Sequence, residues 1–493
     1  MKFISTREKK QEVNASEAIL TGIASQGGLF VPSSIPKINI PLETLKEYNY
    51  EELALYILSL FLEDFSKEEL KEAINAAYKN NFSAKEIVPL KEVGDCFFME
   101  LYHGPTLAFK DIALTLLPRL LNLSAKKQGS KLTPVVLTAT SGDTGKAALE
   151  GFSNAPGVKI MVFYPENGVS KIQKLQMNSQ EGDNCSVIGI KGNFDNAQRG
   201  VKELFQDKAL KEKLAAKGYT LTSANSINIG RLLPQIVYYF YSYLTLLREG
   251  KICLGEEINF SVPTGNFGDI LAGYYGKLMG LPVNKLLCAS NENNVLYDFF
   301  QNGVYDRRRE LKITTSPSMD ILISSNLERL LFEASGRDEI LIKNLMEELT
   351  TKGFYEISSN IKERLQDFYG DFTKEEEVLP LIKELYDRTN YLMDTHTAVA
   401  YGVYRKYQSS HKDGRKTVIL STASPFKFAS SICKALSLKI EEESPFNATD
   451  VLSDSLRLPV PEAIEMLKRK PILHNTICLP KDMKKSLESF LGI

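Results

Sequence analysis

Short apolar, β-branched runs alternate with helical patterns along most of the chain after about residue 92. The runs at residues 135–140, 160–164, 258–262 and 418–421 lead through Gly- or Ser-bearing turns into helical patterns at 141–152, 170–179, 269–280 and 425–436. Strands that alternate with helices predict a mostly parallel sheet covered on both faces, an α/β architecture. Because ligands in such sheets bind beyond the carboxyl ends of the strands, the turns after these runs are the candidate binding positions.

The first part of the chain has a different pattern. Residues 1–92 contain a short strand, a turn at the run QGGLFVP (residues 26–32) and two amphipathic helices, of which one is expected over residues 51–65 with Tyr56 and Leu60 on its apolar side. We therefore expect a separate N-terminal module over residues 1–92. At 493 residues and 55.3 kDa the chain is too long for one compact core, so a body of two or three domains is expected.

Composition and charge exclude several classes of protein. Hydrophobic residues make up 43% and charged residues 25% of the chain, which are ordinary globular values. Sixty Lys and Arg residues against 61 Asp and Glu residues give no field that would favour nucleic acid. The most apolar helical pattern, at residues 235–247, is too short to span a membrane, and residues 1–10 contain no apolar signal segment. A cytoplasmic location is the expected default.

Cysteine and histidine spacing argues against a metal centre. The six cysteines are scattered without the short paired spacing of zinc sites, and none of the four histidines pairs with another at ligand spacing. We expect reduced thiols and no metal, so other residues must carry the chemistry.

A lysine enters a helix behind a Gly-Pro turn in the run HGPTLAFKD, residues 103–111. Apolar neighbours can desolvate the amine of Lys110, which lowers its pKa and makes it a usable nucleophile. A lone lysine is more often a surface side chain whose stem lies on apolar residues. His103 has two interpretations, because it can orient the lysine loop or contact a substrate phosphate.

Two turns of small residues follow predicted strands. In TATSGDTGKAA, residues 138–148, backbone amides can point into a pocket at a helix N-terminus, which suits a carboxylate or phosphate, although an ordinary capped turn has the same composition. In SVPTGNFGDILAG, residues 261–273, the turn offers amide donors to a phosphate dianion with the help of the helix dipole. Either turn alone is weak evidence.

Three further segments carry polar groups at strand or helix ends. In LSTASPFKF, residues 420–428, the hydroxyl of Thr422 can donate a hydrogen bond to a ring nitrogen of a ligand or only cap a helix. The run SANSINIGRLLPQ, residues 223–235, places amide side chains and one arginine at a helix entry. The run DTHTA lies at residues 394–398.

Taken together, these runs resemble those of the threonine synthases, in particular their microbial branch, which are pyridoxal-phosphate enzymes. Residues 103–111 match every named position of the family's lysine motif, which implies that Lys110 holds the cofactor as a Schiff base and later moves protons at the substrate. The resemblance also implies two sets of ligands. The expected cofactor-binding residues are Lys110, Gly265, Asn266, Phe267, Gly268, Asp269, Thr422 and Asp143, and the expected substrate-binding residues are Ser141, Thr144, Lys146, Asn228, Arg231 and His103.

Several positions refine this resemblance. Related pyridoxal enzymes carry Asn where this chain has Asp143, which favours the synthase branch over dehydratases. Ser424 and Phe426 depart from the family phrase, which usually has His and Ala there, and Thr395 replaces a proline. Residues 311–387 are the least diagnostic stretch.

The resemblance implies a fold type II pyridoxal-phosphate enzyme with two doubly wound α/β subdomains over residues 93–493, after the N-terminal threonine synthase module. The implied reaction is γ-elimination and β-addition of water, which converts O-phospho-L-homoserine to L-threonine and phosphate. A phospholyase or hydroxy-amino-acid dehydratase on the same scaffold is the nearest alternative, and a non-catalytic binding protein is a more distant one. The expected partner is this small substrate, without nucleic acid or membrane, and the oligomeric state stays open.

Overall fold

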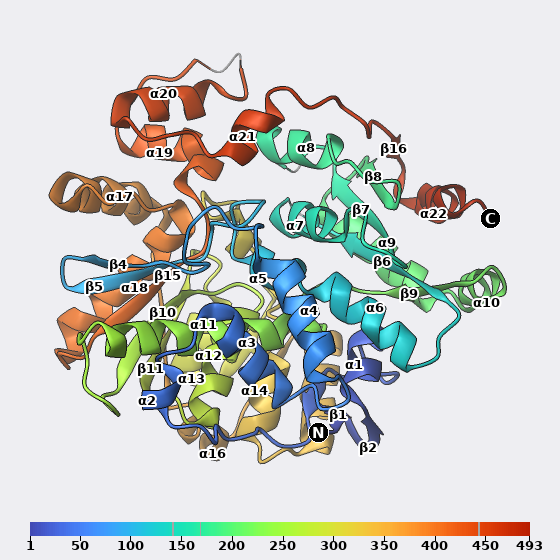
Figure 1. Ribbon diagram of the computed structural model, residues 1–493, viewed down its shortest axis with the longest axis horizontal. Coiled ribbons are helices and arrows are strands. Elements are labelled where there is room, and N and C mark those ends of the chain that lie inside the picture. Colours follow the sequence, from blue (N-terminus) through green and yellow to red (C-terminus); the bar gives the residue numbers. More distant parts are fainter. Residues whose placement is uncertain (141, 168, 442–443) are drawn as a thin grey trace.

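Two sheets of mostly parallel strands form the frame of the molecule (Figure 1). The computed structural model describes residues 1–140, 142–167, 169–441 and 444–493. Within these residues the larger sheet has the strand order β14 (Phe368–Phe372), β11 (Val283–Ser290), β10 (Ile258–Pro263), β15 (Thr417–Ser421), β5 (Cys96–Glu100) and β4 (Leu90–Val93). Only the edge pair β4 and β5 is antiparallel in this sheet.

The smaller sheet is parallel throughout. Its strand order is β16 (Ile477–Cys478), β8 (Cys185–Ile190), β7 (Lys159–Pro165), β6 (Thr133–Ala139) and β9 (Tyr219–Thr222). The helices around it are α6 (Leu117–Lys127), α7 (Asp143–Phe152), α8 (Lys171–Asn178), α9 (Phe194–Gln206), α10 (Lys208–Ala216) and α22 (Met483–Leu491).

Both faces of each sheet are buried, because successive side chains of a strand enter different hydrophobic clusters. On β6, Val136 belongs to the largest cluster, whereas Val135 and Leu137 belong to a smaller one on the opposite face. On β15, Val418 and Ile419 divide in the same way between two clusters. This double coverage confirms the predicted fold of two doubly wound α/β units.

The helices around the larger sheet complete its two covered faces. They are α5 (Lys110–Leu114), α11 (Ile229–Arg248), α12 (Gly268–Met279), α13 (Val295–Asn302), α14 (Leu327–Ala334), α15 (Glu339–Thr351), α16 (Ser359–Glu363), α17 (Glu375–Thr389), α18 (Thr395–His411), α19 (Ala429–Ala435), α20 (Asn447–Leu456) and α21 (Glu462–Leu467). A short ribbon of β12 (Val304–Asp306) and β13 (Phe354–Glu356) and the 3-10 turns η1 (Pro317–Met319) and η2 (Pro425–Phe428) lie between them, whereas the turn η3 (Pro480–Asp482) precedes α22 beside the smaller sheet.

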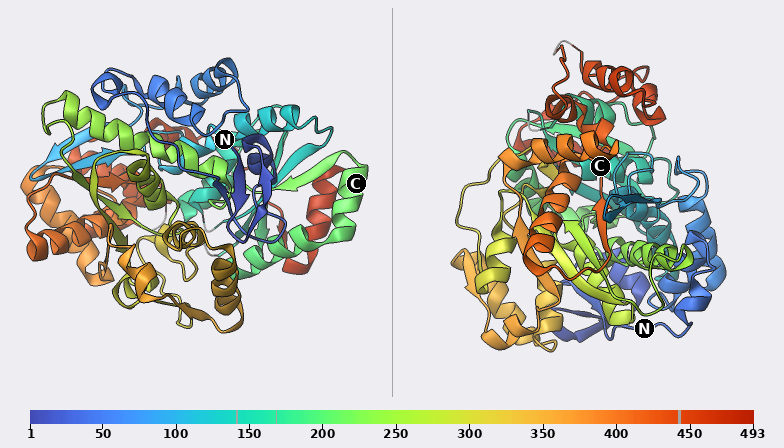
Figure 2. Two further views of the ribbon diagram at one scale, coloured as in Figure 1. Left: turned by 90° about the horizontal axis from the view of Figure 1, so that it is seen from below. Right: turned by 90° about the vertical axis from the view of Figure 1, so that its left-hand side faces the viewer.

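The N-terminal segment forms a small antiparallel sheet and a group of helices. Its elements are β1 (Phe3–Ser5), β2 (Glu8–Val13), β3 (Phe30–Pro32), α1 (Ala15–Thr21), α2 (Leu42–Leu45), α3 (Tyr50–Ser59) and α4 (Lys67–Tyr78). Figure 2 shows these blue elements against the green helix α11, and their apolar side chains join the largest cluster. The predicted module boundary at residue 92 stays a prediction, and β4 beside it is already a strand of the larger sheet.

The strand and helix units predicted after residue 92 are confirmed, whereas the N-terminal segment contains three strands and four helices before Leu90, in place of the one short strand and two helices expected. Helix ends also differ from the expected bounds. The helix expected over residues 51–65 stops at Ser59, since the chain then turns so that Asp64 accepts a hydrogen bond from the amide of Ser16, 3.0 Å away, and Ser66 caps α4. The helix expected over residues 425–436 begins as the 3-10 turn η2.

The apolar helix expected over residues 235–247 is longer than predicted, because α11 begins at Ile229 and has 20 residues, and most of its side chains are buried in the core. In the part of the chain that the structure describes, none of the helices combines the length and apolar character needed to cross a membrane.

Candidate active site

Lys110 is held at the start of α5 by a tightly packed loop. The carboxylate of Asp111 accepts hydrogen bonds from the amide and hydroxyl of Thr106, at 2.8 and 2.5 Å. A Cβ atom at Gly104 would lie 2.5 Å from that of Asp111, so only glycine fits there. The amide of Phe109 donates to the carbonyl of Thr422, 2.9 Å away, which ties the loop to the end of β15.

The amine of Lys110 is buried, and its positive charge is only partly compensated by nearby groups. The side chain is 10% exposed, and its Nζ lies 3.1 Å from the hydroxyl of Ser318 and 3.6 Å from the carboxylate of Asp143. Burial lowers the pKa of Lys110 to about 8, against the opposing effect of Asp143 and with help from the positive charges of Lys427 and Arg231. A fraction of the amine is therefore unprotonated, and nucleophilic, near neutral pH.

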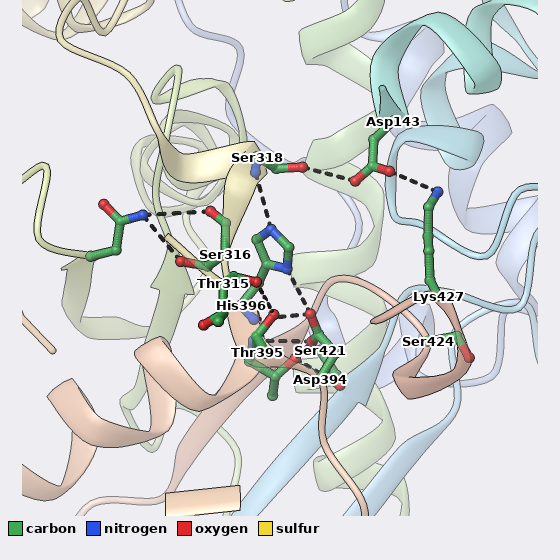
Figure 3. Close-up of polar contacts among 12 residues, drawn as sticks. Asp143, Thr315, Ser316, Ser318, Asp394, Thr395, His396, Ser421, Ser424 and Lys427 are labelled. Atoms are coloured by element: carbon green, nitrogen blue, oxygen red, sulfur yellow. Dashed lines mark hydrogen bonds and ion pairs between the residues drawn. The ribbon is translucent and has the colours of Figure 1, made fainter. Parts of the chain in front are cut away.

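Asp143 is the centre of a charged cluster (Figure 3). Its carboxylate lies 3.0 Å from Nζ of Lys427 and accepts hydrogen bonds from Ser318 and Gln173, both at 2.8 Å. Although burial opposes ionisation, the charges of Lys427 and Lys110 hold the pKa of Asp143 well below its usual range. Asp143 is thus a permanent anion beside Lys110.

The turn η1 brings Ser318 to this cluster. The amide of Ser318 donates to Nε2 of His396 at 3.2 Å, which makes Nδ1 the protonated nitrogen, and Nδ1 donates to Asp394 at 2.7 Å (Figure 3). Both His396 and Asp394 are buried. The polar chain from Asp394 to Ser318 therefore fixes the hydroxyl that contacts Lys110.

The turn between β10 and α12 lies next to η1. A Cβ atom at Gly265 would lie 2.8 Å from the carbonyl of Ser318, and Phe267 adopts a left-handed conformation with φ of 65°. No side chain caps the N-terminus of α12 among the described residues. The carboxylate of Asp269 accepts hydrogen bonds from Tyr238 and Tyr239, at 2.5 and 2.9 Å, so this acid faces α11.

Arg231 brings an uncompensated positive charge to the site. It is 3% exposed, its Nη1 donates to the carbonyl of Ala224 at 2.8 Å, and its buried Nε has no partner among the residues that the structure describes. None of the described carboxylates forms an ion pair with it, and burial lowers its pKa to about 10. A buried guanidinium in this state is costly unless an anion binds it.

These groups fit pyridoxal phosphate. A partly deprotonated lysine suits an aldehyde, while the amides of residues 265–268 and the orphaned Nε of Arg231 suit phosphate groups. Thr422 is 5% exposed, and in the described structure its hydroxyl forms no hydrogen bond, so this group is free to meet a ring nitrogen.

The remaining predicted ligands have other contacts or positions. Nζ of Lys146 lies 2.7 Å from Glu150, and His103 lies 2.9 Å from Glu100. The amide nitrogen of Asn228 donates to the carbonyls of Ile19 and Ser223, and its oxygen caps α11.

Two further predicted ligands belong to the turn before α7. Thr144 is half-buried and follows Asp143 in the helix, whereas Ser141 lies outside the described residues. The roles of all these residues stay predictions. The structure brings together Lys110, Asp143, Arg231 and the turn at residues 265–269.

Three contributors were not singled out in the sequence: Ser318, Gln173 and Lys427. Ser318 comes from the stretch 311–387, which carried no diagnostic pattern. Lys427 lies in the run LSTASPFKF at residues 420–428, and its role could have been predicted from the sequence. A lysine that closely follows an apolar strand requires a buried partner for its charge. That partner is Asp143.

Burial of Lys110 predicts a pH-dependent stability of the cofactor-free protein. Between pH 8 and 10.5 the folded state loses this proton while the unfolded chain retains it, so the free energy of unfolding should rise with pH by roughly 3 kcal/mol from this group. Urea unfolding at pH 7.5 and 10 measures the change, and Lys110→Met should lack this part of it. An identical pH dependence in the parent and the variant would contradict the depressed pKa.

The chain matches three family descriptions in sequence order. Residues 2–78 match "Threonine synthase N terminus", residues 84–423 match "Pyridoxal-phosphate dependent enzyme", and residues 397–471 match "Threonine synthase, C-terminal". The second match alone covers more than half of the chain.

Proteins that align with most of this chain are named threonine synthase or threonine synthase-like. The chain is 38% identical over 441 residues to threonine synthase of Pseudomonas aeruginosa, covering 88% of this chain and 90% of that one. It is 39% identical over 499 residues to "Threonine synthase-like 1" of Homo sapiens, covering 97% of this chain but only 66% of the human protein. This chain is thus similar to one part of a longer human relative.

The fold is also similar to that of a solved relative. The crystal structure of pyridoxal-phosphate-bound threonine synthase from Brucella melitensis superimposes with a TM-score of 0.87 at 33% identity, covering 100% of both chains. Its match extends over the N-terminal segment and both sheets. Together with the matched descriptions and the buried lysine site, these similarities establish that the chain belongs to the threonine synthase family of pyridoxal-phosphate dependent enzymes.

Proposed function

We propose that this chain converts O-phospho-L-homoserine and water to L-threonine and phosphate. The observation that carries the proposal is the pairing of a nucleophilic, buried Lys110 with an uncompensated buried Arg231 in one site. A reaction on a phosphorylated amino acid requires these two properties together, a group that attaches the cofactor and a cation that holds a phosphate.

The cofactor would be held by residues from three strand ends. Lys110 would attach its aldehyde, the turn at residues 265–268 would bind its phosphate, and Thr422 would bond the ring nitrogen. When bound, pyridoxal phosphate withdraws electrons from the substrate and so makes the protons on Cα and Cβ removable. Asp143, fixed as an anion by Lys427, would place a negative charge beside Lys110 and the bound cofactor.

Lys110 would also carry protons. Its pKa of about 8 places the amine near the operating pH, which is the optimum for a group that must both accept and return a proton. Asp143 and Ser318 hold the amine from one side, at 3.6 and 3.1 Å, so they orient it for transfer. A base at Cα and Cβ is what the elimination of phosphate requires.

Arg231 would hold the substrate phosphate and retain it after elimination. Its guanidinium is fixed by Ala224 on one side and leaves Nε unpartnered, so it can donate to an anion without breaking an existing ion pair. A retained phosphate is itself a base that can activate the incoming water at Cβ. Lys146 would assist only if its amine left Glu150.

The product ratio separates this proposal from its nearest alternative. After phosphate leaves, a synthase adds water at Cβ, whereas a phospholyase lets the product hydrolyse to 2-oxobutanoate. We expect threonine and phosphate in equal amounts, with little keto acid, when protein, cofactor and O-phospho-L-homoserine are incubated and all three products are quantified. An excess of 2-oxobutanoate over threonine would replace the synthase with a phospholyase.

The cytoplasm is the compartment that we propose for this reaction. All six cysteines are free thiols. Cys96, Cys185 and Cys288 are buried, and burial raises the pKa of each of these thiols, so they serve as core side chains. Unpaired thiols are typical of a reducing compartment.

A further inference from the structure

Arg329 is a second buried arginine without a carboxylate partner, and it lies away from Lys110. It stands in α14 with 0% exposure, and among the described residues it makes no ion pair. The adjacent Glu328 is not its partner, because that carboxylate binds Arg7 at 2.7 Å and the hydroxyl of Thr6 at 2.5 Å. A charge buried at this cost needs strong hydrogen bonds on every side.

The guanidinium of Arg329 reaches three segments that are far apart in the sequence. Nε donates to the carbonyl of Phe30 in β3 at 2.9 Å, and Nη2 donates to the carbonyl of Ile227 at 2.6 Å. Nη1 donates to the side-chain oxygen of Asn326. The planar fork thus ties the N-terminal sheet, the entry of α11 and the start of α14 together.

Asn326 passes this constraint to the candidate phosphate turn. Because Arg329 can only donate, the amide oxygen of Asn326 must face it, and the amide nitrogen must face the other way. That nitrogen and the backbone amide of Asn326 both donate to the carbonyl of Asn266, at 2.9 and 3.1 Å. A Cβ atom at Gly268 would lie 3.4 Å from the same side-chain nitrogen.

We propose that Arg329 is a positioning residue through which the N-terminal module sets the turn that binds the phosphate of the cofactor. This inference rests on the proposed function, since it takes residues 265–268 as the phosphate site. Through Arg329 the N-terminal module would influence the cofactor site without contacting the cofactor itself. Arg329 also holds Ile227, next to the helix entry from which Arg231 extends.

The test compares Arg329→Lys with Arg337→Lys in the full chain. Both substitutions keep the positive charge and remove a guanidinium that binds the N-terminal module, since Arg337 donates to the carbonyls of Pro32 and Ser33. Only Arg329 connects onward to Asn266. The dissociation constants of pyridoxal phosphate and of phosphate-free pyridoxal are measured by absorbance titration of the cofactor-free proteins.

We expect Arg329→Lys to raise the dissociation constant of pyridoxal phosphate about tenfold, and that of pyridoxal by less than about threefold. Arg337→Lys should leave both within about twofold of the parent. Equal weakening of the two ligands, or equal effects of the two substitutions, would reduce Arg329 to a general structural residue and overturn the inference.

A second variant covers the case in which Arg329→Lys does not fold. Asn326→Ala keeps the bonds of Arg329 to Phe30 and Ile227 and removes the side chain that joins Nη1 of Arg329 to the carbonyl of Asn266. Asn326→Ala should also raise the dissociation constant of pyridoxal phosphate more than that of pyridoxal, and unchanged dissociation constants would overturn the inference. If the parent itself binds no pyridoxal phosphate at Lys110, the proposed function and this inference both fail, whereas normal binding in the parent and in all variants removes only the inference.

Discussion

Lys110→Ala is expected to lower kcat/KM for O-phospho-L-homoserine by at least about 10³-fold, because one group attaches the cofactor and moves the protons. The fold should persist, since the substitution removes a costly buried charge and leaves Asp143 paired with Lys427, 3.0 Å away. Initial rates on parent and variant, with thermal unfolding alongside, measure both effects.

Lys110→Arg is the matched control for this loss. It keeps a positive charge beside Asp143, so the electrostatics of the cluster are largely retained, but a guanidinium is not a usable nucleophile. We expect it to be as inactive as Lys110→Ala. Borohydride reduction of the parent followed by peptide mapping should place the cofactor on Lys110, and an adduct on another lysine or an active Lys110→Arg protein would refute the assignment.

Arg231→Met is expected to cost on the order of 2 to 5 kcal/mol in transition-state binding, measured as the fall in kcat/KM, because a desolvated contact to a dianion is lost. Its effect on thermal stability should be small or favourable. The buried guanidinium has no carboxylate to leave behind, and the apolar side chain removes an unpartnered Nε from the interior.

Lys146→Met is the companion variant, since the sequence assigns Lys146 the same role. Its amine is bound to Glu150 and Gln180, at 2.7 and 2.6 Å, so removal leaves a half-buried carboxylate without its cation. We expect a loss of stability larger than the loss of kcat/KM. If neither Arg231→Met nor Lys146→Met changes kcat/KM, the substrate phosphate is held elsewhere.

The catalytic lysine and the fold could be predicted from the sequence because both depend on local patterns. Alternating strands and helices determine the sheets, and the run at residues 103–111 has the spacing of one compact loop, in which Gly104 is required by Asp111. The turn at residues 265–269 follows a strand, so its place at the sheet edge was also predictable.

The rest of the site depends on contacts across long sequence separations. Ser318 reaches Lys110 only because a network at Asp394 and His396 holds η1 in place, and nothing in residues 311–387 marks that turn. The resemblance implied that Asn228 binds substrate, yet the donors of its side chain are used by the carbonyls of Ile19 and Ser223. Whether a polar side chain is free or already bonded is a property of tertiary packing.

Isotope transfer from labelled water tests the proposed reaction most directly. With O-phospho-L-homoserine in H₂¹⁸O, cleavage of the Cγ–O bond and addition of water at Cβ should give threonine with one ¹⁸O in its hydroxyl group and phosphate without ¹⁸O. Mass spectrometry of both products reads the outcome. Homoserine together with ¹⁸O-labelled phosphate, or 2-oxobutanoate as the main product, would contradict the proposal.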